Sequence, residues 1–444
     1  MDFKALTKLQ SAALIVFVVV AAVGGSIAFS LWNASQPSPE NIRIGICADL
    51  DNTIGKGIWR AAILAAEEVN AEGGVLGRNL TIVAADDDGE GSQDVAVMTS
   101  ALVRLITVDK ADFIISNVLS PQGFFPEVDI CRENNKIMFT TGATLDEFPQ
   151  RVLDDYENYK YFFKLFGANT TSIATGLLDD VATVAKYGGF TKVALLYQDV
   201  STFEQTAAIL ESSFPSRGLE IVFSGSIPVT STDFTSYFAA VEASEAEIVV
   251  PLIFTRASVP FVKEWYDRES PFVVVGVLSG CGDPEFWDAT GGKCEYVSIR
   301  GPPFVAGYNL TDRSMQTREV YLERWGTPIP TAYATAAYDG VRCILPDAIK
   351  RAGTTETQAV IKTLETIDAA TSLARHFVFT KAHDFMIGVA GSASPPEEYL
   401  LFGVLQWQAN KTFVTVVPEG LMEDSGAKYM FPPWQGPWAI NLTP

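Results

Sequence analysis

The sequence has very few histidines and far fewer basic than acidic residues. Only two histidines, His376 and His383, occur among its 444 residues. The formal net charge is −21, and the isoelectric point is about 4.5. A protein that binds nucleic acid needs clustered lysine and arginine to contact phosphates, so this balance argues against a nucleic-acid partner. The acidity is typical of a solvated surface.

Motifs for catalysis are also missing. A Ser-His-Asp relay or a histidine zinc site needs its histidines among the loops that follow strands. Both histidines lie instead in RHFVFTKAH (375–383), where we expect ordinary surface side chains. IGKG (54–57) lacks the first glycine and the final Ser or Thr of a P-loop, and no G-x-S-x-G or G-x-G-x-x-G occurs in a strand-turn-helix context. We therefore expect neither an enzyme nor a cofactor.

Charge is absent from Leu9 to Pro39. Within this stretch the segment 11–32 is almost wholly apolar, and a membrane helix needs roughly 20 such residues. Lys4 and Lys8 precede it, which favours a cytoplasmic N-terminus and export of everything that follows. We expect an uncleaved anchor that holds the protein on the outer face of the cell membrane.

The anchor divides the first 41 residues into three parts. Residues 1–10 form the cytoplasmic N-terminus, 11–32 the membrane segment, and 33–41 a polar, Pro-rich linker. Ser26 and Ala28 offer a small-residue cleavage site, so a removed signal peptide stays open as an alternative. No cysteine follows the apolar run, which excludes a bacterial lipoprotein anchor.

Two further features suit an exported protein. Cys281 and Cys294 enclose a short loop with a Gly-Gly turn, for which we expect a disulfide in an oxidising compartment. Cys47 and Cys343 lie in apolar or amphipathic runs and are expected to be small buried hydrophobes. Six of the 13 asparagines begin an N-x-[ST] sequon, which indicates a glycosylated surface such as that of an archaeal cell: Asn33, Asn79, Asn169, Asn309, Asn410 and Asn441.

Past residue 41, short apolar runs alternate with longer amphipathic ones. The amphipathic patterns at 94–106, 203–214 and 259–268 predict helices. Buried strands that alternate with helices predict parallel sheets covered on both faces, here an α/β fold of two doubly wound lobes. The apolar runs that predict strands are 43–50, 80–86, 111–116, 136–142, 192–199, 219–225, 246–254 and 271–277.

The loops that follow these strands are rich in Ser, Thr, Gly and Asn, which suit a small polar ligand. One of them contains the acidic run DDD (86–88), which could suggest a metal. It ends a strand and is followed by Gly-Glu-Gly, so we expect a solvated turn and a helix N-cap.

The order of motifs resembles one family. EEVNAEGGVLGR (67–78) resembles the "E-E-x-N-A-x-G-G-x-x-G-R" signature of type I periplasmic binding proteins of the branched-chain amino acid (Leu/Ile/Val) transporter group. We expect its helix to stop at Asn70, which tolerates a left-handed conformation, and we expect Gly73 and Gly74 to reach positive φ in the tight turn that follows. The other segments that match the family in order are FIISNVLS (113–120), TTGATLDEF (140–148), AYDGVRCILPDAIKRAG (337–353) and VLQWQANKTFVTVVPE (404–419).

The resemblance implies two lobes that are joined by three crossovers and close around a small ligand. Lobe 1 would comprise 42–164 and 299–385, and lobe 2 would comprise 165–298 and 386–444. The family hands its ligand to a membrane permease and its ATPase. The resemblance therefore implies the solute-binding component of an ABC importer. The alternatives are an extracellular ligand-sensing domain and a glycosylated structural component of a surface filament.

The resemblance also implies ligand-binding residues. In the family a Ser at the third-strand loop binds the ligand carboxylate, which corresponds to Ser120. The next loop supplies a backbone group and a hydroxyl, at Gly142 and Thr144. Aromatic positions of the second lobe correspond to Phe203 and Phe254. We therefore expect a small carboxylate- or amide-bearing ligand.

The family's acidic partner for an amino-acid ammonium is displaced in this sequence. It would fall near Leu278 or Ser279, and neither is acidic. Asp283 could replace it from the Cys281–Cys294 loop, and Asp49 or Asp51 could do so from the first loop. We expect a ligand with a free ammonium only if one of these aspartates points inward.

Overall fold

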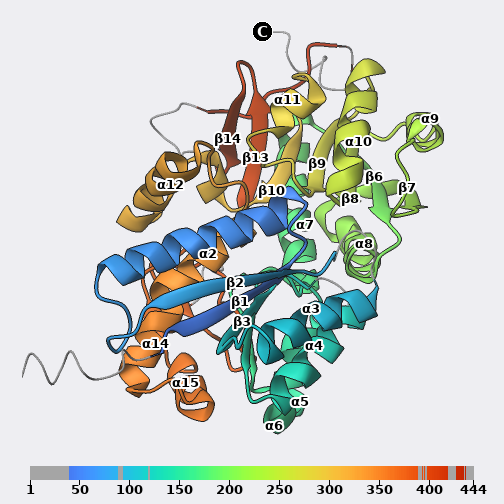
Figure 1. Ribbon diagram of the computed structural model, residues 1–444. Helices are drawn as coiled ribbons and strands as arrows, with labels where there is room; N and C mark the ends of the chain where they lie inside the picture. Colours follow the sequence, from blue (N-terminus) through green and yellow to red (C-terminus); the bar gives the residue numbers. More distant parts are fainter. Residues whose placement is uncertain are drawn as a thin grey trace, which may run out of the picture. The chain divides into compact units, whose positions relative to one another are not determined.

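Two open sheets, the first parallel and the second largely parallel, form the framework of the chain (Figure 1). The structure is a computed structural model. It describes residues 40–88, 94–118, 121–388, 393, 395, 398–418, 427–434 and 436. The predicted anchor 11–32, Ser120, Asn33 and Asn441 lie outside the described residues. Among the helices that it describes, none is long and apolar enough to cross a membrane.

The first sheet has the strand order β2-β1-β3-β4-β5, and all neighbouring strands are parallel. The first four runs predicted as strands form four of its members. The fifth strand was not predicted from the sequence. The strands are β1 (Ile42–Ala48), β2 (Leu80–Asp86), β3 (Phe113–Ser116), β4 (Ile137–Thr140) and β5 (Phe162–Lys164).

The second sheet has the order β14-β13-β10-β9-β8-β6-β7. It is parallel from β7 to β10, whereas β13 and β14 are antiparallel additions at one edge. A separate two-stranded ribbon pairs β11 (Asp368–Ala369) with β12 (Phe377–Val378). The seven strands are β6 (Lys192–Gln198), β7 (Glu220–Ile227), β8 (Ile248–Ile253), β9 (Val273–Leu278), β10 (Ser298–Gly301), β13 (Gly403–Gln408) and β14 (Thr412–Val417).

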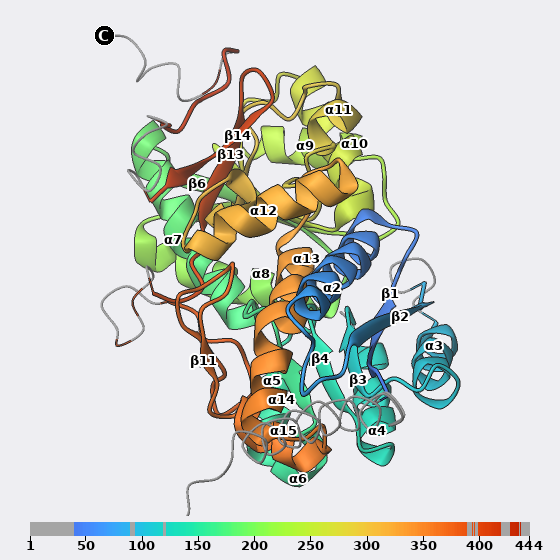
Figure 2. The ribbon, with the colours of Figure 1, turned by 60° about the vertical axis from the view of Figure 1, so that its left-hand side comes forward.

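Helices cover both faces of the first sheet. One face carries α3 (Val95–Thr107), α4 (Pro121–Glu133), α5 (Glu147–Asp154) and α6 (Tyr156–Tyr159). On the other face, helices from late in the chain join α2 in one layer, and Figure 2 shows α13 beside α2. That layer comprises α2 (Thr53–Ala71), α12 (Asp312–Trp325), α13 (Ala332–Asp339), a π-helical turn (Gly340–Ile344), α14 (Leu345–Ala352) and α15 (Thr357–Leu364).

The second sheet is covered in the same way. The helix layer on one face comprises α7 (Thr170–Gly188), α8 (Ser201–Ser213) and a 3-10 turn (Phe214–Arg217). The other face carries α9 (Thr235–Ala243), α10 (Thr255–Asp267), α11 (Phe286–Thr290) and a second 3-10 turn (Pro303–Ala306). The predicted α/β architecture with two doubly wound sheets is confirmed.

Strand alternation explains why each sheet has two cores. In β1, Ile44 and Ile46 enter the core beneath α2, whereas Cys47 enters the core beneath α3 and α4. Successive strand side chains point to opposite faces, so a strand that is apolar at nearly every position is buried on both.

The turn after α2 differs from the expectation at one residue. Asn70 is helical, and its side chain pairs with the backbone of Leu80, where the amide donates to the carbonyl at 2.8 Å and the N–H donates back at 2.6 Å. Gly73 and Gly74 have the positive φ that was expected of them. Gly74 has φ of +75°, and a Cβ there would stand 2.2 Å from the Arg78 carbonyl oxygen. Only glycine fits this turn.

Two expectations about exposure are wrong. His383 is buried, because its ring stacks on Phe163 with a centroid separation of 4.0 Å and its Nδ1 lies 2.9 Å from the Phe162 carbonyl oxygen. In the acidic run, Asp86 and Asp88 are exposed as expected, but Asp87 is buried. The N-cap of α3 is Asp94, outside this run.

Candidate functional site

The predicted ligand loops of the two sheets meet at one hydrogen bond. Thr144 follows β4 of the first sheet, and Thr202 lies in the first turn of α8, directly after β6 of the second sheet. Their hydroxyl oxygens are 3.1 Å apart, and both side chains are buried. Ligands of open parallel sheets bind beyond the carboxyl ends of strands, which is where both residues lie.

An aromatic pair adjoins this contact. Phe203 follows Thr202 and packs against Phe254, which follows β8, with ring centroids 4.6 Å apart. Gln198 fixes the backbone of Phe254, because the buried Oε1 of Gln198 accepts the Phe254 N–H at 2.7 Å. The structure therefore brings Thr144, Phe203 and Phe254 together.

Gly142 is present in this region, but its backbone donor is already used. The Gly142 N–H donates to Thr140 Oγ1 at 3.1 Å, and the next N–H, from Ala143, donates to the Val118 carbonyl at 2.8 Å. These bonds hold the loop after β4 against the loop after β3. Gly142 thus shapes the loop, and the hydroxyl of Thr144 is the group that faces the second sheet's loops.

The acidic candidates lie around the start of α2. Asp49 Oδ1 accepts the N–H groups of Asp51 and Asn52 at 3.1 and 3.2 Å, so it caps its own loop. Asp51 is exposed. Asp283 is half-buried; burial raises its pKa, and a hydrogen bond with Thr53 opposes this rise. Asp283 is therefore the acid that links a loop of the second sheet to a helix of the first.

Two residues near Asp283 that interact with each other, Tyr321 and Arg60, were not predicted from the sequence. Tyr321 of α12 is buried, which raises its pKa to about 12, while a hydrogen bond with Arg60 of α2 opposes the rise and the charge of Asp283 adds to it. Arg60, Tyr321 and Asp283 are thus electrostatically coupled. Each lies in an ordinary amphipathic helix or loop, so no local sequence signal distinguishes them.

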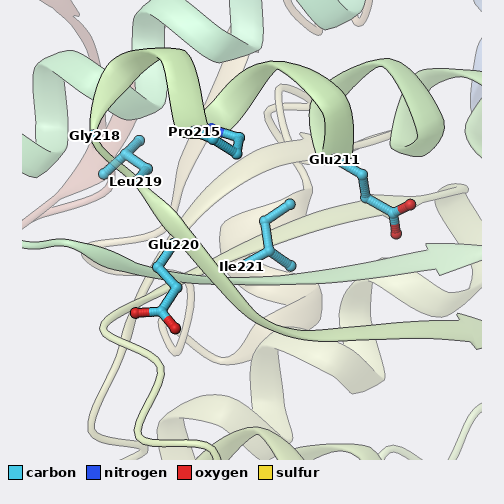
Figure 3. Close-up of a pocket in the computed structure, with 6 residues that line it drawn as sticks. All are labelled: Glu211, Pro215, Gly218, Leu219, Glu220 and Ile221. Carbon is cyan, nitrogen blue, oxygen red and sulfur yellow. The ribbon is translucent and has the colours of Figure 1, made fainter.

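A hollow of about 440 Å³ lies elsewhere, at the amino end of β7 (Figure 3). It is open, and it contains none of the residues predicted to bind ligand. Because ligands of these sheets bind at the opposite, carboxyl ends of the strands, it carries no functional assignment. Its lining residues are Glu211, Pro215, Gly218, Leu219, Glu220 and Ile221.

The expected disulfide is wrong. Cys281 and Cys294 are free thiols, both buried in the core of the second sheet. Each is held separately: the Cys281 carbonyl accepts the Trp407 indole N–H at 2.7 Å, and the Cys294 thiol hydrogen-bonds to Thr290. Burial raises the pKa of Cys294 to about 11 and that of Cys281 well above its usual value, so both remain unreactive thiols.

The described sequons differ in their surroundings. Asn79, Asn309 and Asn410 are exposed. Asn169 is half-buried, where its side chain caps α7 by accepting the Ser172 N–H and its amide donates to Asp384. Among these four asparagines, Asn169 has the least room for a glycan.

Comparison with known proteins gives a consistent result. A family model described as periplasmic binding protein matches residues 42–389. The Leu/Ile/Val-binding protein homolog 7 of Brucella abortus is 23% identical over 402 residues, which cover 88% of this chain and 94% of that protein.

Solved structures share the fold at low identity. The branched-chain amino acid transporter substrate-binding protein LivJ of Streptococcus pneumoniae, in complex with isoleucine, has a TM-score of 0.68 and 16% identity, covering 85% of this chain and 99% of that chain. A solute-binding protein of an ABC transporter from R. palustris, in complex with benzoate, has a TM-score of 0.66 and 15% identity, covering 84% and 95%.

Proposed function

Because this chain belongs to the periplasmic binding protein family, we propose that it is the extracytoplasmic solute-binding component of an ABC importer. The observation that supports this most directly is the contact between Thr144 and Thr202, beside Phe203 and Phe254. It joins the strand-end loops of two separate sheets around polar and aromatic side chains. A ligand held there would contact both lobes, and its affinity would depend on their closure.

The ligand we propose is a small molecule with a carboxylate or amide on an apolar body. Isoleucine and benzoate, the ligands of two structural neighbours, share a carboxylate and an apolar body but differ in the ammonium. Ser120 and Thr144 supply hydroxyl donors for the carboxylate, and the aromatic pair supplies the apolar wall. Asp283 is the proposed partner for an ammonium, because it is half-buried at the junction with α2.

The proposed assembly follows from the family. The two lobes would comprise 42–164 with 299–385 and 165–298 with 386–444, and a permease and an ATPase would receive the ligand. Exposed Asn79, Asn309 and Asn410 are the sequons that we expect to be glycosylated.

Calorimetry on the ligand site tests the function. Thr144→Ala and Ser120→Ala each remove a hydroxyl, so we expect tenfold or greater losses of affinity for the carboxylate that binds, equivalent to about 1.4 kcal/mol. Phe203→Ala should lose at least as much. The matched controls, Thr183→Ala on α7 and Phe223→Ala on β7, should bind normally. Unchanged affinity in all three site variants would place the ligand elsewhere.

The ligand panel should include isoleucine, an aliphatic amide and benzoate. Loss of isoleucine binding but not benzoate binding in Asp283→Asn would support the ammonium assignment. Equal effects on both ligands would remove it. Failure of the folded protein to bind any carboxylate or amide would contradict the proposed function.

We also propose that residues 11–32 anchor the protein to the membrane. The segment is uncharged, long enough to span a bilayer and preceded by two lysines. Carbonate extraction of membranes from the native organism should leave the full-length protein in the membrane fraction. Release of a protein that begins near residue 29 would show a cleaved signal peptide instead.

A further inference from the structure

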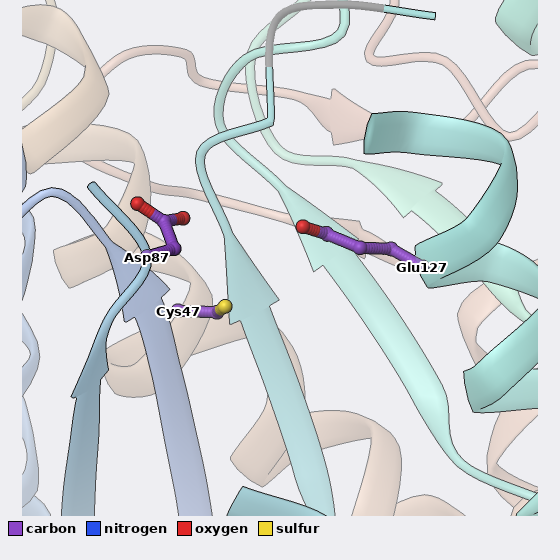
Figure 4. Close-up of side chains that lie close together, drawn as sticks. All are labelled: Cys47, Asp87 and Glu127. Atoms are coloured by element: carbon purple, nitrogen blue, oxygen red, sulfur yellow. The ribbon is translucent and has the colours of Figure 1, made fainter. Parts of the chain in front are cut away.

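Three buried side chains of the first sheet converge at the strand ends, on the face covered by α3 and α4. Cys47 lies near the end of β1, Asp87 directly follows β2, and Glu127 lies in α4. Each is at most 2% exposed. One ligand atom of each, the thiol sulfur or a carboxylate oxygen, lies within 4.8 Å of the other two. Figure 4 shows Glu127 extending from its helix toward the other two side chains.

The cluster contains a polar atom that the protein does not satisfy. Glu127 Oε2 accepts the Ser116 hydroxyl at 2.6 Å. In the part of the chain that the structure describes, Glu127 Oε1 has no hydrogen-bond partner, although it is fully buried. The Cys47 thiol hydrogen-bonds to Asp87. Burial raises the pKa of Glu127 to about 8, against the lowering effect of the Ser116 bond. An unsatisfied buried carboxylate oxygen calls for a proton or a cation.

The mixture of donors decides which cation fits. Calcium and magnesium prefer six or more oxygen ligands, including water, and a thiolate suits neither. Zinc accepts four ligands and combines cysteine sulfur with carboxylate oxygen, at about 2.3 and 2.0–2.2 Å respectively. Ligand atoms of a tetrahedral zinc stand about 3.5 Å apart, so the three atoms, which lie within 4.8 Å of one another, would draw together around the metal.

Cys131 is a candidate for the remaining position. It lies four residues after Glu127 and therefore on the same face of α4. It is fully buried, and burial, with a smaller contribution from Glu127, raises the pKa of its thiol, as both do for Cys47. A second sulfur on this side would complete a four-ligand set.

We propose that Cys47, Asp87 and Glu127 form a zinc-binding site, with Cys131 adjacent. Binding forms a sulfur–zinc bond while the thiol proton, and any proton held by Glu127, passes to solvent. The metal would join the ends of two strands to α4, in the layer below the ligand loops. The site is independent of the proposed transport ligand, because no residue is shared.

Zinc titration of the full chain tests the proposal. After treatment with chelator, the wild-type protein should bind one equivalent of zinc in competition with a chromophoric chelator. Cys47→Ser and Glu127→Gln should each weaken binding by 30-fold or more. Cys343→Ser is the matched control, because Cys343 lies in the π-helical turn on the other face of the sheet, and it should bind as the wild type does.

Cobalt provides a readout that needs no variant. Cobalt bound through Cys47 should give the wild-type protein a thiolate-to-metal charge-transfer band, and zinc should abolish it. A folded wild-type protein that binds neither zinc nor cobalt at micromolar concentration would overturn the proposal and leave a cluster that holds protons only. Failure to bind any carboxylate or amide in the calorimetry, with zinc binding intact, would count against the proposed function alone.

Discussion

At the scale of single residues, burial changes what His383 can do. Its ring stacks on Phe163 of β5, its Nδ1 lies near the Phe162 carbonyl oxygen, and its Nε2 lies 3.2 Å from Glu365. Burial lowers the pKa of His383, although the Phe162 carbonyl and Glu365 oppose this effect. The native protein therefore holds this imidazole neutral at a pH where the unfolded chain would protonate it.

This difference predicts an acid-sensitive contribution to stability. The unfolded state binds the proton first, so the free energy of unfolding should fall as the pH drops below about 6.5. His383→Gln should remove this loss, so its stability should decline less than that of the wild type between pH 7 and pH 5. Each unit by which the pKa is lowered corresponds to about 1.4 kcal/mol.

Urea unfolding at several pH values measures this effect. His376→Gln is the control, because His376 is the other histidine of the chain and is exposed. Parallel stability curves for the wild type and His383→Gln would show that the proton on His383 does not couple to folding.

At the scale of elements, the apolar pattern of the sequence predicted secondary structure best where a strand is buried along its whole length. Each of the eight predicted apolar runs overlaps an observed strand, because a strand covered on both faces must be apolar at nearly every position. The three-residue β5 carried too little pattern to be recognised. Helix α4 forms although Gly123 and Pro126 disfavour helix, because Phe124 and Val128 stabilise it by packing in the core.

The turn after α2 shows why the sequence rules for helix ends gave the wrong conformation for Asn70. Asn70 is a residue that commonly ends helices, and its sequence context offered no sign of a partner ten residues away. The reciprocal bonds to Leu80 make it a link between the end of α2 and the start of β2. The tertiary contact with Leu80 gave the Asn70 side chain its partner, and Asn70 remained within the helix.

At the scale of the whole molecule, a buried ion pair joins two connecting segments. Lys164, the last residue of β5, lies 3.1 Å from Asp384 and donates to the Ala168 carbonyl at 3.1 Å. Asn169, the N-cap of α7, donates to the same carboxylate. The chain leaves the first sheet at Lys164, and Asp384 lies in the later segment that precedes β13 of the second sheet, so the pair fastens these two segments together.

Removing one partner should be far more costly than removing both. Lys164→Met leaves the Asp384 carboxylate buried without its cation, and we expect a loss of about 3–5 kcal/mol in unfolding free energy. Adding Asp384→Asn should recover part of this loss. Lys192→Met, which breaks the surface pair with Glu245, should cost much less. Additive losses in the double variant, measured by urea denaturation, would contradict a direct coupling of the two charges.

Much of the site could be anticipated, but its internal bonding could not. The order of motifs indicated the family, and the strand-end loops indicated where Thr144, Phe203 and Phe254 would lie. That the Gly142 N–H is used within its own loop depends on Thr140 Oγ1 and on the approach of the neighbouring strand's loop. Such bonds depend on side-chain rotamers and on the spacing of neighbouring loops, which a linear pattern does not contain.

The sequence by itself determined the alternation of strands and helices, the two sheets and the family, because each rests on periodicities of two or 3.6 residues and on motif order. Tertiary structure alone decided that His383 is buried and that Cys47, Asp87 and Glu127 meet. The physical reason is distance along the chain. Residues that lie 40 or 80 positions apart acquire a common environment only when strands and helices pack.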